Sequence, residues 1–402
     1  MIQHLQTEAT DATYLILWLD YDREGENICF EVMENVQSYM KKENFQQIYR
    51  AKFSSIVDQD IRRAFNSLKD EPNLNESLAV DARQEIDLKI GVAFSRFQTL
   101  YLQRRFEVNA KLVSYGPCQT PALGFCVERD DEIKNFVSQT FYRVIPTVTL
   151  PNGESCDLNW AADRTLDPEE AMDIREEILN IGRVTVVESI NKESRRERPE
   201  ALNTVHMLKI ASSIFGYGPS VASSLAEKLY LKGYITYPRT ESTSYPKNFD
   251  HHEIVHALSR TPTFGEYAGK LLQGGLNKPK NGKDAGDHPP ISPTLKVPMR
   301  ERLEPDEWKF YEFVARHYLA TISPDAKFHK KNVVLRAGKH EFTVTGTAPQ
   351  SKGFTEITPW VKIYDNYIPN FQKGEVHHLT NVEVKTGKVM KILNVDQLTL
   401  YM

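Results

Sequence analysis

The strongest constraint on the fold is a short apolar run that ends abruptly in a cluster of acids. The run spans Tyr14–Leu19, and the acidic loop Asp20–Glu26 follows it directly. A continuous apolar run of this length is typical of a strand buried on both faces of a parallel sheet. Residues 26–40 then show apolar positions at helical spacing, and residues 48–56 form a second apolar patch. We therefore predict a strand, an acidic loop, a helix and a second strand, as in half of a doubly wound α/β domain.

The acidic loop offers a candidate metal site. Asp20, Asp22 and Glu24 occupy alternating positions, and oxygen ligands of this kind are the ones that Mg²⁺ selects. The competing interpretation is a solvated loop whose acids are favoured by the N-terminus of the following helix. Parallel sheets bind ligands at the carboxyl ends of their strands, so the position of the loop favours a site where the three acids converge on one ion.

The rest of the chain alternates between helical and strand-like texture. Residues 61–132 and 200–325 are mostly helical, whereas 141–190, 332–336 and 342–345 read as strands. A helical block inserted between two strand-rich blocks predicts one β domain whose chain leaves and returns. Such a domain makes a natural hinge or arch.

Charge and composition narrow the class of protein. The 402 residues contain 50 Lys+Arg against 54 Asp+Glu, which gives a net charge of −4. This balance excludes a histone-like polycation, so nucleic acid would have to bind in a localised basic groove. With 40% hydrophobic and 26% charged residues, the chain is typical of soluble globular proteins of about two to four domains.

The cysteines and the apolar segments indicate the cellular compartment in which the protein is expected. Cys29, Cys118, Cys126 and Cys156 include no C-x-x-C pair, which disfavours a zinc ribbon or a disulfide framework and fits a reducing compartment. No stretch approaches the ~18 apolar residues of a membrane span, and the first residues lack the basic start of a signal peptide. We expect a cytosolic or nuclear protein with no membrane partner.

A tyrosine near the middle of the chain follows a predicted helix-turn-helix. Residues 204–215 and 219–233 read as two helices around a Gly-Pro turn, and the segment Tyr234–Ser242 follows them. Pro238 biases Tyr237 away from helical conformation. We therefore expect Tyr237 to lie in an extended loop.

The residue two positions on suggests a chemical role for Tyr237. In an extended segment Arg239 projects on the same side as Tyr237. A phenol with a pKa of ~10 is a weak nucleophile and needs cationic help to attack a phosphodiester. Tyr237 is thus a candidate nucleophile with Arg239 as its stabilising cation. The competing interpretation is a core or rim aromatic, which is common for tyrosine.

Four runs of residues, in this order, carry a family resemblance: LWLDYDREGENICFEV, YGPCQTPALGFCVERDDEI, KLYLKGYITYPRTESTSYP and DAGDHPPI. They resemble the type IA DNA topoisomerases, and within them the eukaryotic topoisomerase III beta group most closely. The resemblance extends from about Thr13 to about Trp360.

The resemblance implies a multidomain fold in which a partial Toprim α/β domain, helical domains and a β-rich arch form a toroid. The implied domains are the C-terminal half of the Toprim domain at 1–58, a helical strand-binding domain at 59–138, a discontinuous β-rich gate at 139–198 and 329–385, a helical domain with the catalytic tyrosine at 199–328, and a non-matching tail at 386–402.

The resemblance also implies an activity. Tyr237 would join the 5′ phosphate of a cut single strand, a second strand would pass, and the bond would be resealed without ATP. Arg239 would stabilise the phosphate, and Asp20, Asp22 and Glu24 would hold Mg²⁺. Residues implied in nucleic-acid binding are Arg83, Arg96, Ser114, Gln119 and His288.

Around Arg96 the helical segment interleaves cations with rings. Such a face can track a single strand by charge and stacking. We interpret its aromatic residues as mostly core, with the arginines extending along an apolar surface. The residues concerned are Phe94, Arg96, Phe97, Tyr101, Arg104, Arg105 and Phe106.

The family pattern is incomplete at both ends. The family's first strand and Glu-Lys-Pro motif have no counterpart here, and the last residues do not match its continuation, so we expect a truncated chain with weak or no relaxation activity. An alternative is a catalytically impaired module that only binds single-stranded DNA or RNA. The resemblance further implies DNA and RNA as substrates, a Tudor-domain partner, and a nuclear location that extends to the cytoplasm.

A different enzyme class is raised by His252-Glu253-x-x-His256, a formal HExxH zinc motif. The metzincin form would need a glycine and a histidine where the chain has Ser259 and Pro262. We therefore favour a chance match on a surface helix capped by Asp250 over a zinc metallopeptidase.

Overall fold

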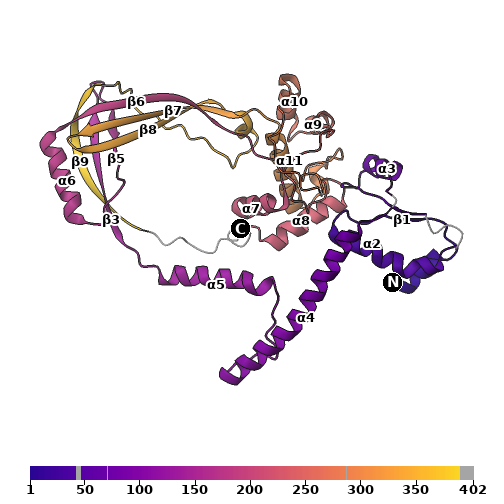
Figure 1. Cartoon of the computed structure of the whole chain (residues 1–402). Helices are drawn as coiled ribbons and strands as arrows, with labels where there is room; N and C mark the ends of the chain where they lie inside the picture. Colours follow the sequence, from indigo (N-terminus) through magenta and orange to yellow (C-terminus); the bar gives the residue numbers. More distant parts are fainter. Residues whose placement is uncertain (42–46, 70, 287, 390–402) are drawn as a thin grey trace. The chain divides into compact units, whose positions relative to one another are not determined.

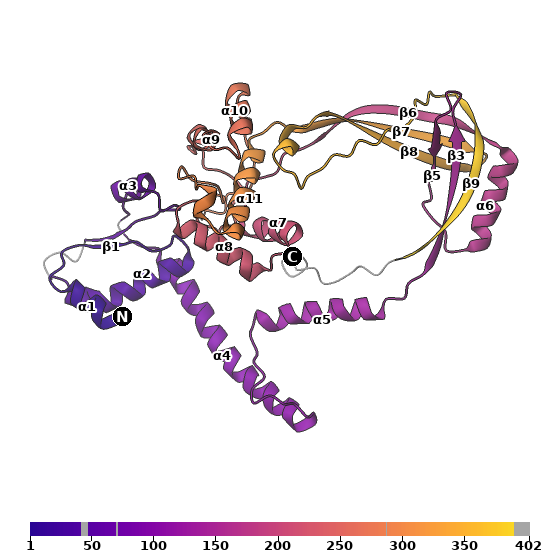
Figure 2. The same ribbon diagram turned by 180° about the vertical axis from the view of Figure 1, so that it is seen from behind.

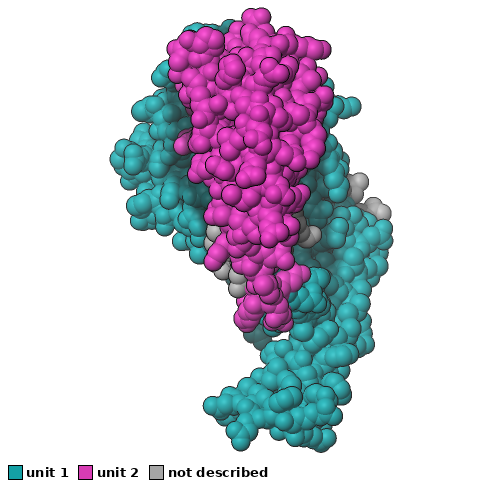
Figure 3. All heavy atoms as spheres, turned by 90° about the vertical axis from the view of Figure 1, so that its left-hand side faces the viewer, with its two compact units in different colours: residues 1–129, 199–322, 395–402 teal, residues 130–198, 323–394 magenta. Residues whose placement is uncertain are grey.

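The computed structural model describes residues 1–41, 47–69, 71–286 and 288–389, and these form two compact units. Within the described residues, unit 1 comprises 1–129 and 199–322, and unit 2 comprises 130–198 and 323–389 (Figure 3). The chain thus leaves unit 1 for unit 2, returns, and leaves it again. The segments of unit 2 lie near the ranges 139–198 and 329–385 that the sequence analysis assigned to a β-rich domain.

Unit 1 begins with the predicted strand, loop, helix and strand. The elements are α1 (Ile2–Ala9), β1 (Leu15–Leu17), α2 (Arg23–Val36), a 3₁₀ turn (Gln37–Tyr39) and β2 (Ile48–Arg50). The two strands pair in parallel, with Leu15 opposite Ile48. This arrangement confirms the predicted order of strand, acidic loop, helix and second strand.

The first strand is shorter and less buried than its sequence predicts. Only Leu17 of β1 is buried, and Tyr14 is 58% exposed, so the expectation of burial on both faces is wrong. The reason is that the sheet has only two strands in the described part of the chain, so neither strand is an inner one.

The remainder of unit 1 is helical (Figures 1 and 2). Before the chain enters unit 2 it forms α3 (Asp58–Asn66), α4 (Leu74–Arg105) and the start of α5 (Gln119–Asn135). After its return it forms α7 (Thr204–Phe215), α8 (Pro219–Leu231), α9 (His251–Ser259), α10 (Gly265–Gly274), a 3₁₀ turn (Arg300–Arg302) and α11 (Pro305–Thr321).

The predicted helix-turn-helix is confirmed as α7 and α8. The Asn203 side chain accepts a hydrogen bond from the His206 N–H and caps α7. Gly216 ends that helix in the left-handed conformation at φ 68°, which glycine adopts without strain. Pro219 is the first residue of α8. These local signals place Tyr237 just beyond the end of α8.

The core of the helical part lies around α11, which is buried on most sides. A helix of this kind must be covered on several sides, and α8 packs against it. A capping box between Glu304 and Glu307 fixes its start. Its buried aromatic residues are Trp308, Phe310, Tyr311, Phe313 and Tyr318.

Unit 2 is an antiparallel sheet with one helix packed on it. The strand order is β4-β3-β9-β6-β7-β8-β5. The strands are β3 (Thr140–Thr149), β4 (Ser155–Asp157), β5 (Asn159–Trp160), β6 (Arg183–Arg196), β7 (Ala326–Ala337), β8 (His340–Ser351) and β9 (Val376–Lys388); the helix is α6 (Pro168–Ile181), and a 3₁₀ turn spans Gly353–Glu356.

The sheet of unit 2 joins segments from both sides of the helical insertion. β6 precedes that insertion and β7 follows it, yet the two strands pair with Ile190 opposite Asn332. Ala171, Ile174 and Ile178 of α6 pack into the apolar core of the sheet. β9 extends through Lys388, so the first residues of the predicted tail 386–402 belong to the sheet, and 390–402 lie outside the described residues.

No helix in the described ranges is long and apolar enough to cross a membrane.

The core of unit 2 yields a stability prediction. Phe342 of β8 is fully buried, so Phe342→Ala should lower the free energy of unfolding by about 3–5 kcal/mol through lost burial and a residual cavity. Tyr364 of the same unit is 73% exposed, and Tyr364→Ala should change it by less than about 0.5 kcal/mol. Urea denaturation of the full chain, followed by circular dichroism, measures both. Equal losses in the two variants would contradict the assigned core.

Candidate active site

A buried arginine that the sequence analysis did not single out shapes the acidic loop. Arg50 ends β2 and is fully buried, and its Nε donates to Glu26 Oε1 at 2.9 Å. Its Nη2 donates to the carbonyl oxygen of Asp20 at 2.8 Å. The carbonyl oxygens of Leu17, Leu19 and Ala51 face its Nη1. The guanidinium therefore holds the backbone of the strand end and of the loop in one shape.

The partner carboxylate is satisfied on both oxygens. Glu26 is fully buried, and its Oε2 accepts the N–H of Asn73 at 2.6 Å, just before α4. A buried ion pair is tolerated when further hydrogen bonds complete its coordination, as they do here. An arginine at the end of an apolar strand, with a glutamate inside the acidic cluster, is the sequence signal that could have indicated this pair.

The start of α2 adds a steric constraint on the loop. A Cβ at Gly25 would lie 1.9 Å from the carbonyl oxygen of Asp20, so only glycine fits this close approach. The Gly25 N–H donates to Asp22 Oδ1 at 2.8 Å, which makes Asp22 the N-cap of α2. One oxygen of Asp22 is thereby fixed, and the other is directed elsewhere.

The structure does not bring the three predicted metal ligands to one point. Asp20 Oδ1 accepts the Tyr230 hydroxyl at 3.2 Å, Asp22 Oδ2 accepts the Tyr237 hydroxyl at 2.6 Å, and Glu24 pairs with Arg83 at 2.6 Å. In the part of the chain that the structure describes, no three acidic, histidine or cysteine side chains form a group able to hold a metal. Each of the three carboxylates pairs with a residue on another helix or loop. Their oxygens are suitable ligands for a hard cation, but the three side chains are not arranged to bind one ion together.

Asp20 and Asp22 nevertheless influence one another. Burial raises the pKa of the Asp20 carboxyl, the hydrogen bond from Tyr230 opposes this, and the negative charge of Asp22 raises the pKa further. A carboxyl whose pKa is raised by burial and by a neighbouring carboxylate is typical of functional sites.

Tyr237 lies against this loop and is enclosed on several sides. It is 5% exposed, and its backbone N–H donates to the carbonyl oxygen of Ser54 at 2.9 Å. The Tyr230 ring packs edge-on at 5.1 Å between centroids, and the His288 ring lies at 4.4 Å. Burial raises the pKa of the Tyr237 phenol well above its usual range, and the hydrogen bond to Asp22 raises it further. In this arrangement the nucleophile candidate is protonated.

His288, predicted to bind nucleic acid, lies beside Tyr237. It is 2% exposed, and its Nδ1 is 2.9 Å from Ser54 Oγ. Ser54 thus contacts both the backbone of Tyr237 and the ring of His288. This residue follows β2, and the sequence analysis did not identify it.

Arg239 is close to the site but engaged with another residue. Its guanidinium forms an ion pair with Glu227 of α8. Its positive charge lowers the pKa of Tyr237, but only as the smallest of the contributions. Arg239 is therefore near the phenol without contacting its hydroxyl.

The other predicted nucleic-acid residues lie on α4, in the loop that follows it and at the start of α5. Arg83 pairs with Glu24, while Arg96, Ser114 and Gln119 are exposed. The loop is tied to α4, because the Tyr115 N–H donates to the Ser95 hydroxyl at 2.8 Å. The structure brings Arg83 to the acidic loop.

The aromatic face of α4 differs from our interpretation. Phe94, Phe97, Tyr101 and Phe106 are 49%, 65%, 42% and 61% exposed, so the expectation of a core stripe is wrong. Among the described residues α4 is buried mainly near its start, against α2, and in Figures 1 and 2 its far half lies apart from α7–α11. Arg105 lies over the Tyr101 ring at 4.3 Å. This face is thus available for charge and stacking contacts.

The HExxH residues lie on α9, where Asp250 accepts the Glu253 N–H as the expected cap. His252 and His256 are exposed, and the described part of the chain supplies no third ligand to a metal there.

Comparison with known proteins identifies the family. Residues 71–398 match a model described as DNA topoisomerase, and residues 1–56 match the Toprim domain. The chain belongs to the type IA DNA topoisomerase family. It is 44% identical over 386 residues to DNA topoisomerase 3-beta of Arabidopsis thaliana, covering 96% of this chain and 44% of that protein. It is 43% identical over 392 residues to DNA topoisomerase 3-beta-1 of Homo sapiens, covering 96% and 45%. The expected kinship with the topoisomerase III beta group is confirmed.

A solved structure supports the fold. Full-length topoisomerase I from Thermotoga maritima matches all of this chain and 64% of its own, with a TM-score of 0.76 and 22% identity. The chain spans less than half the length of the two curated relatives. The type IA family binds single-stranded DNA and uses a divalent metal ion.

The Arg50–Glu26 pair yields a second prediction. Arg50→Leu should lower the free energy of unfolding by about 3–5 kcal/mol, because it leaves the Glu26 carboxylate buried without its cation. Replacing both members (Glu26→Leu with Arg50→Leu) should cost less than this single change. Arg63→Leu, which breaks an exposed pair, is the control and should cost under about 1 kcal/mol. Equal effects of Arg50→Leu and Arg63→Leu in urea denaturation would refute the claim that the buried Arg50–Glu26 pair stabilises the fold.

The pKa of Tyr237 yields a third prediction, which concerns stability at alkaline pH. Tyrosine in the unfolded chain loses its proton near pH ~10, whereas folded Tyr237 keeps it to higher pH. The resulting stability is fully present below about pH 10 and is lost as pH rises through the folded pKa. Tyr237→Phe should flatten the alkaline decline in stability by about 1.4 kcal/mol per pH unit in urea titrations. A Tyr237→Phe slope equal to wild type would show that the phenol is not shielded.

Proposed function

We propose that this chain carries the strand-cutting centre of a type IA topoisomerase, with Tyr237 as the nucleophile. The observation that carries the proposal is the 2.6 Å hydrogen bond from the Tyr237 hydroxyl to Asp22 Oδ2. It joins the only tyrosine of the Tyr-Pro-Arg run to the acidic loop of the Toprim segment. A hydroxyl that already donates to a carboxylate has a base in place for its proton.

The reaction exchanges one phosphate ester for another. The Tyr237 oxygen attacks the phosphorus of a single strand, an O–P bond forms, and the bond from phosphorus to the 3′ oxygen breaks. The proton of Tyr237 passes to Asp22, and the leaving 3′ oxygen takes up a proton from solvent. After a second strand has passed, the 3′ hydroxyl attacks the 5′-phosphotyrosine and reverses both steps. The ester conserves the bond, so ATP is not required.

Access to this centre requires a local rearrangement. Because Tyr237 is 5% exposed, an incoming strand must displace its neighbours before phosphorus can reach the hydroxyl. The Arg239 side chain is 65% exposed and forms a surface ion pair with Glu227. It can exchange that surface partner for a phosphate, since a guanidinium binds phosphate oxygens through charge-assisted hydrogen bonds.

Mg²⁺ is the proposed metal ion, with Asp20 and Asp22 as its protein ligands. Carboxylate oxygens are hard ligands that suit Mg²⁺, and the ion usually takes only one or two of them. When bound, it would offset the negative charge of the two carboxylates beside the phosphate. Glu24 faces Arg83 and is not part of this pair.

A separate observation favours a second candidate function. The protonated, enclosed Tyr237 and the exposed aromatic and basic face of α4 also suit a module that binds single-stranded DNA or RNA without cutting it. RNA as a substrate, a Tudor-domain partner and a location in the nucleus and cytoplasm stay predictions from the family resemblance.

A covalent-trapping assay separates the two functions. The full chain incubated with labelled single-stranded DNA and Mg²⁺ should give an adduct that resists SDS, and Tyr237→Phe should abolish it. Asp22→Asn should lower the rate of adduct formation about 100-fold, as expected for loss of a positioned base. Tyr364→Phe, which alters an exposed tyrosine, is the matched control.

The same assay, repeated with RNA as the labelled strand, distinguishes between the cutting and the binding function. A gel shift without any adduct, in wild type and variants alike, would favour the binding module. An adduct that persists in Tyr237→Phe would refute the assignment of the nucleophile.

A further inference from the structure

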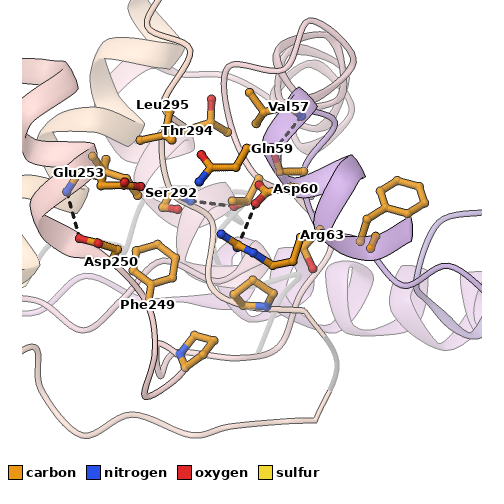
Figure 4. Close-up of a pocket in the computed structure, with 18 of the residues that line it drawn as sticks. Val57, Gln59, Asp60, Arg63, Phe249, Asp250, Glu253, Ser292, Thr294 and Leu295 are labelled. Carbon is orange, nitrogen blue, oxygen red and sulfur yellow. Dashed lines mark hydrogen bonds and ion pairs between the residues drawn. The ribbon is translucent and has the colours of Figure 1, made fainter. Parts of the chain in front are cut away.

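We propose that a pocket behind the Tyr237 segment binds a small planar organic cation. The pocket has a volume of about 510 Å³, within the range of roughly 300–1,000 Å³ that small-molecule sites occupy. One wall is formed by α3 and the loop before it, and the other by α9 with the segment 289–295 (Figure 4). All of these elements belong to unit 1.

The pocket lies on the opposite side of the Tyr237 backbone from the acidic loop. Thr236 lines it, whereas the next side chain, Tyr237, faces Asp22, as alternation along an extended segment requires. The Thr236 N–H donates to the Ser292 carbonyl oxygen, and the Ser292 N–H donates to Thr236 Oγ1, both at 2.9 Å. The pocket therefore shares the backbone of the active site without opening onto its hydroxyl.

A buried hydroxyl in this wall points to a ligand. Ser292 is fully buried, and within the described residues its Oγ has no hydrogen-bond partner although both of its backbone groups are paired. Buried polar atoms are nearly always hydrogen-bonded, because an unpaired one keeps its full desolvation cost. Figure 4 shows Ser292, Gln59 and Thr294 around the centre of the pocket. A ligand with an N–H group would supply the missing partner.

The charged residues that line the pocket indicate the charge that a ligand would carry. Asp60 pairs with Arg63 at 3.3 Å, and Lys52 Nζ is held over the Tyr21 ring at 4.3 Å. Asp250 and Glu253, at the start of α9, complete the charged residues of the lining. Three carboxylates against two cations leave one negative charge, which one positive charge on a ligand balances.

The aromatic lining selects its shape. Phe249 and Phe53 both contribute to the pocket, and a ring face attracts a flat cation such as an amidinium or guanidinium. A molecule of this class would contact α3 and α9 together. It would thereby reinforce the Ser54 and Thr236 backbone positions that hold Tyr237 against Asp22.

Three isosteric probes test this proposal on the full chain. Benzamidine is a planar cation, benzamide its neutral analogue and benzoate its anionic analogue. Isothermal titration and the shift in melting temperature should show benzamidine binding with a Kd on the order of 1 mM, as expected for a small fragment. Benzamide should bind more weakly, and benzoate should give no shift.

Two variants locate the bound probe. Glu253→Gln should weaken benzamidine binding about threefold, because it removes one exposed carboxylate of the lining. Ser292→Ala should weaken it while leaving the melting temperature of the free protein unchanged or raised, since no described residue pairs with the hydroxyl. Glu266→Gln, on α10 and outside the lining, is the control and should bind as wild type does. Equal binding of the three probes, or wild-type affinity in Glu253→Gln, would overturn the proposal.

Discussion

The buried pair of Arg50 and Glu26 is the interaction on which the rest of the site depends. Neither side chain reaches solvent, so each charge needs the other and every remaining hydrogen-bonding position must be filled. Filling them ties the ends of β1 and β2, the acidic loop and the start of α4 together. The loop cannot relax without exposing an unpaired charge. Asp20 and Asp22 are therefore presented to the helical part of unit 1 in a fixed shape.

The proposed nucleophile reaches this loop from a distant segment. Tyr237 and Asp22 are 215 positions apart in the chain, and Ser54 and His288 join the same cluster through their own contacts. The burial that positions the Tyr237 phenol beside Asp22 also keeps the phenol protonated. The same burial therefore lowers its reactivity. Positioning and activation are thus separate requirements, and the second depends on the arrival of a strand and its phosphate.

The sequence predicted best what is decided locally. Asn203 and Pro219 mark helix starts through contacts within a few residues, and both lie where they were expected. The several long motifs in one order identified the family and led to Tyr237 and Asp22 as the proposed site residues. The partners of the carboxylates were beyond this reasoning, because Tyr230 and Arg83 approach the loop through tertiary packing. The exposure of Phe97 was mispredicted for the same reason: an apolar face shows no sign in the sequence of what covers it.

Mapping the covalent link tests the central claim most directly. After incubation with single-stranded DNA and Mg²⁺, nuclease trimming and proteolysis, mass spectrometry of the full chain identifies the residue that carries the nucleotide. We expect a phosphotyrosine link at Tyr237, in the peptide that also contains Arg239, and none in the peptide that contains Tyr230. A nucleotide attached to Tyr230 or to any other residue would contradict it.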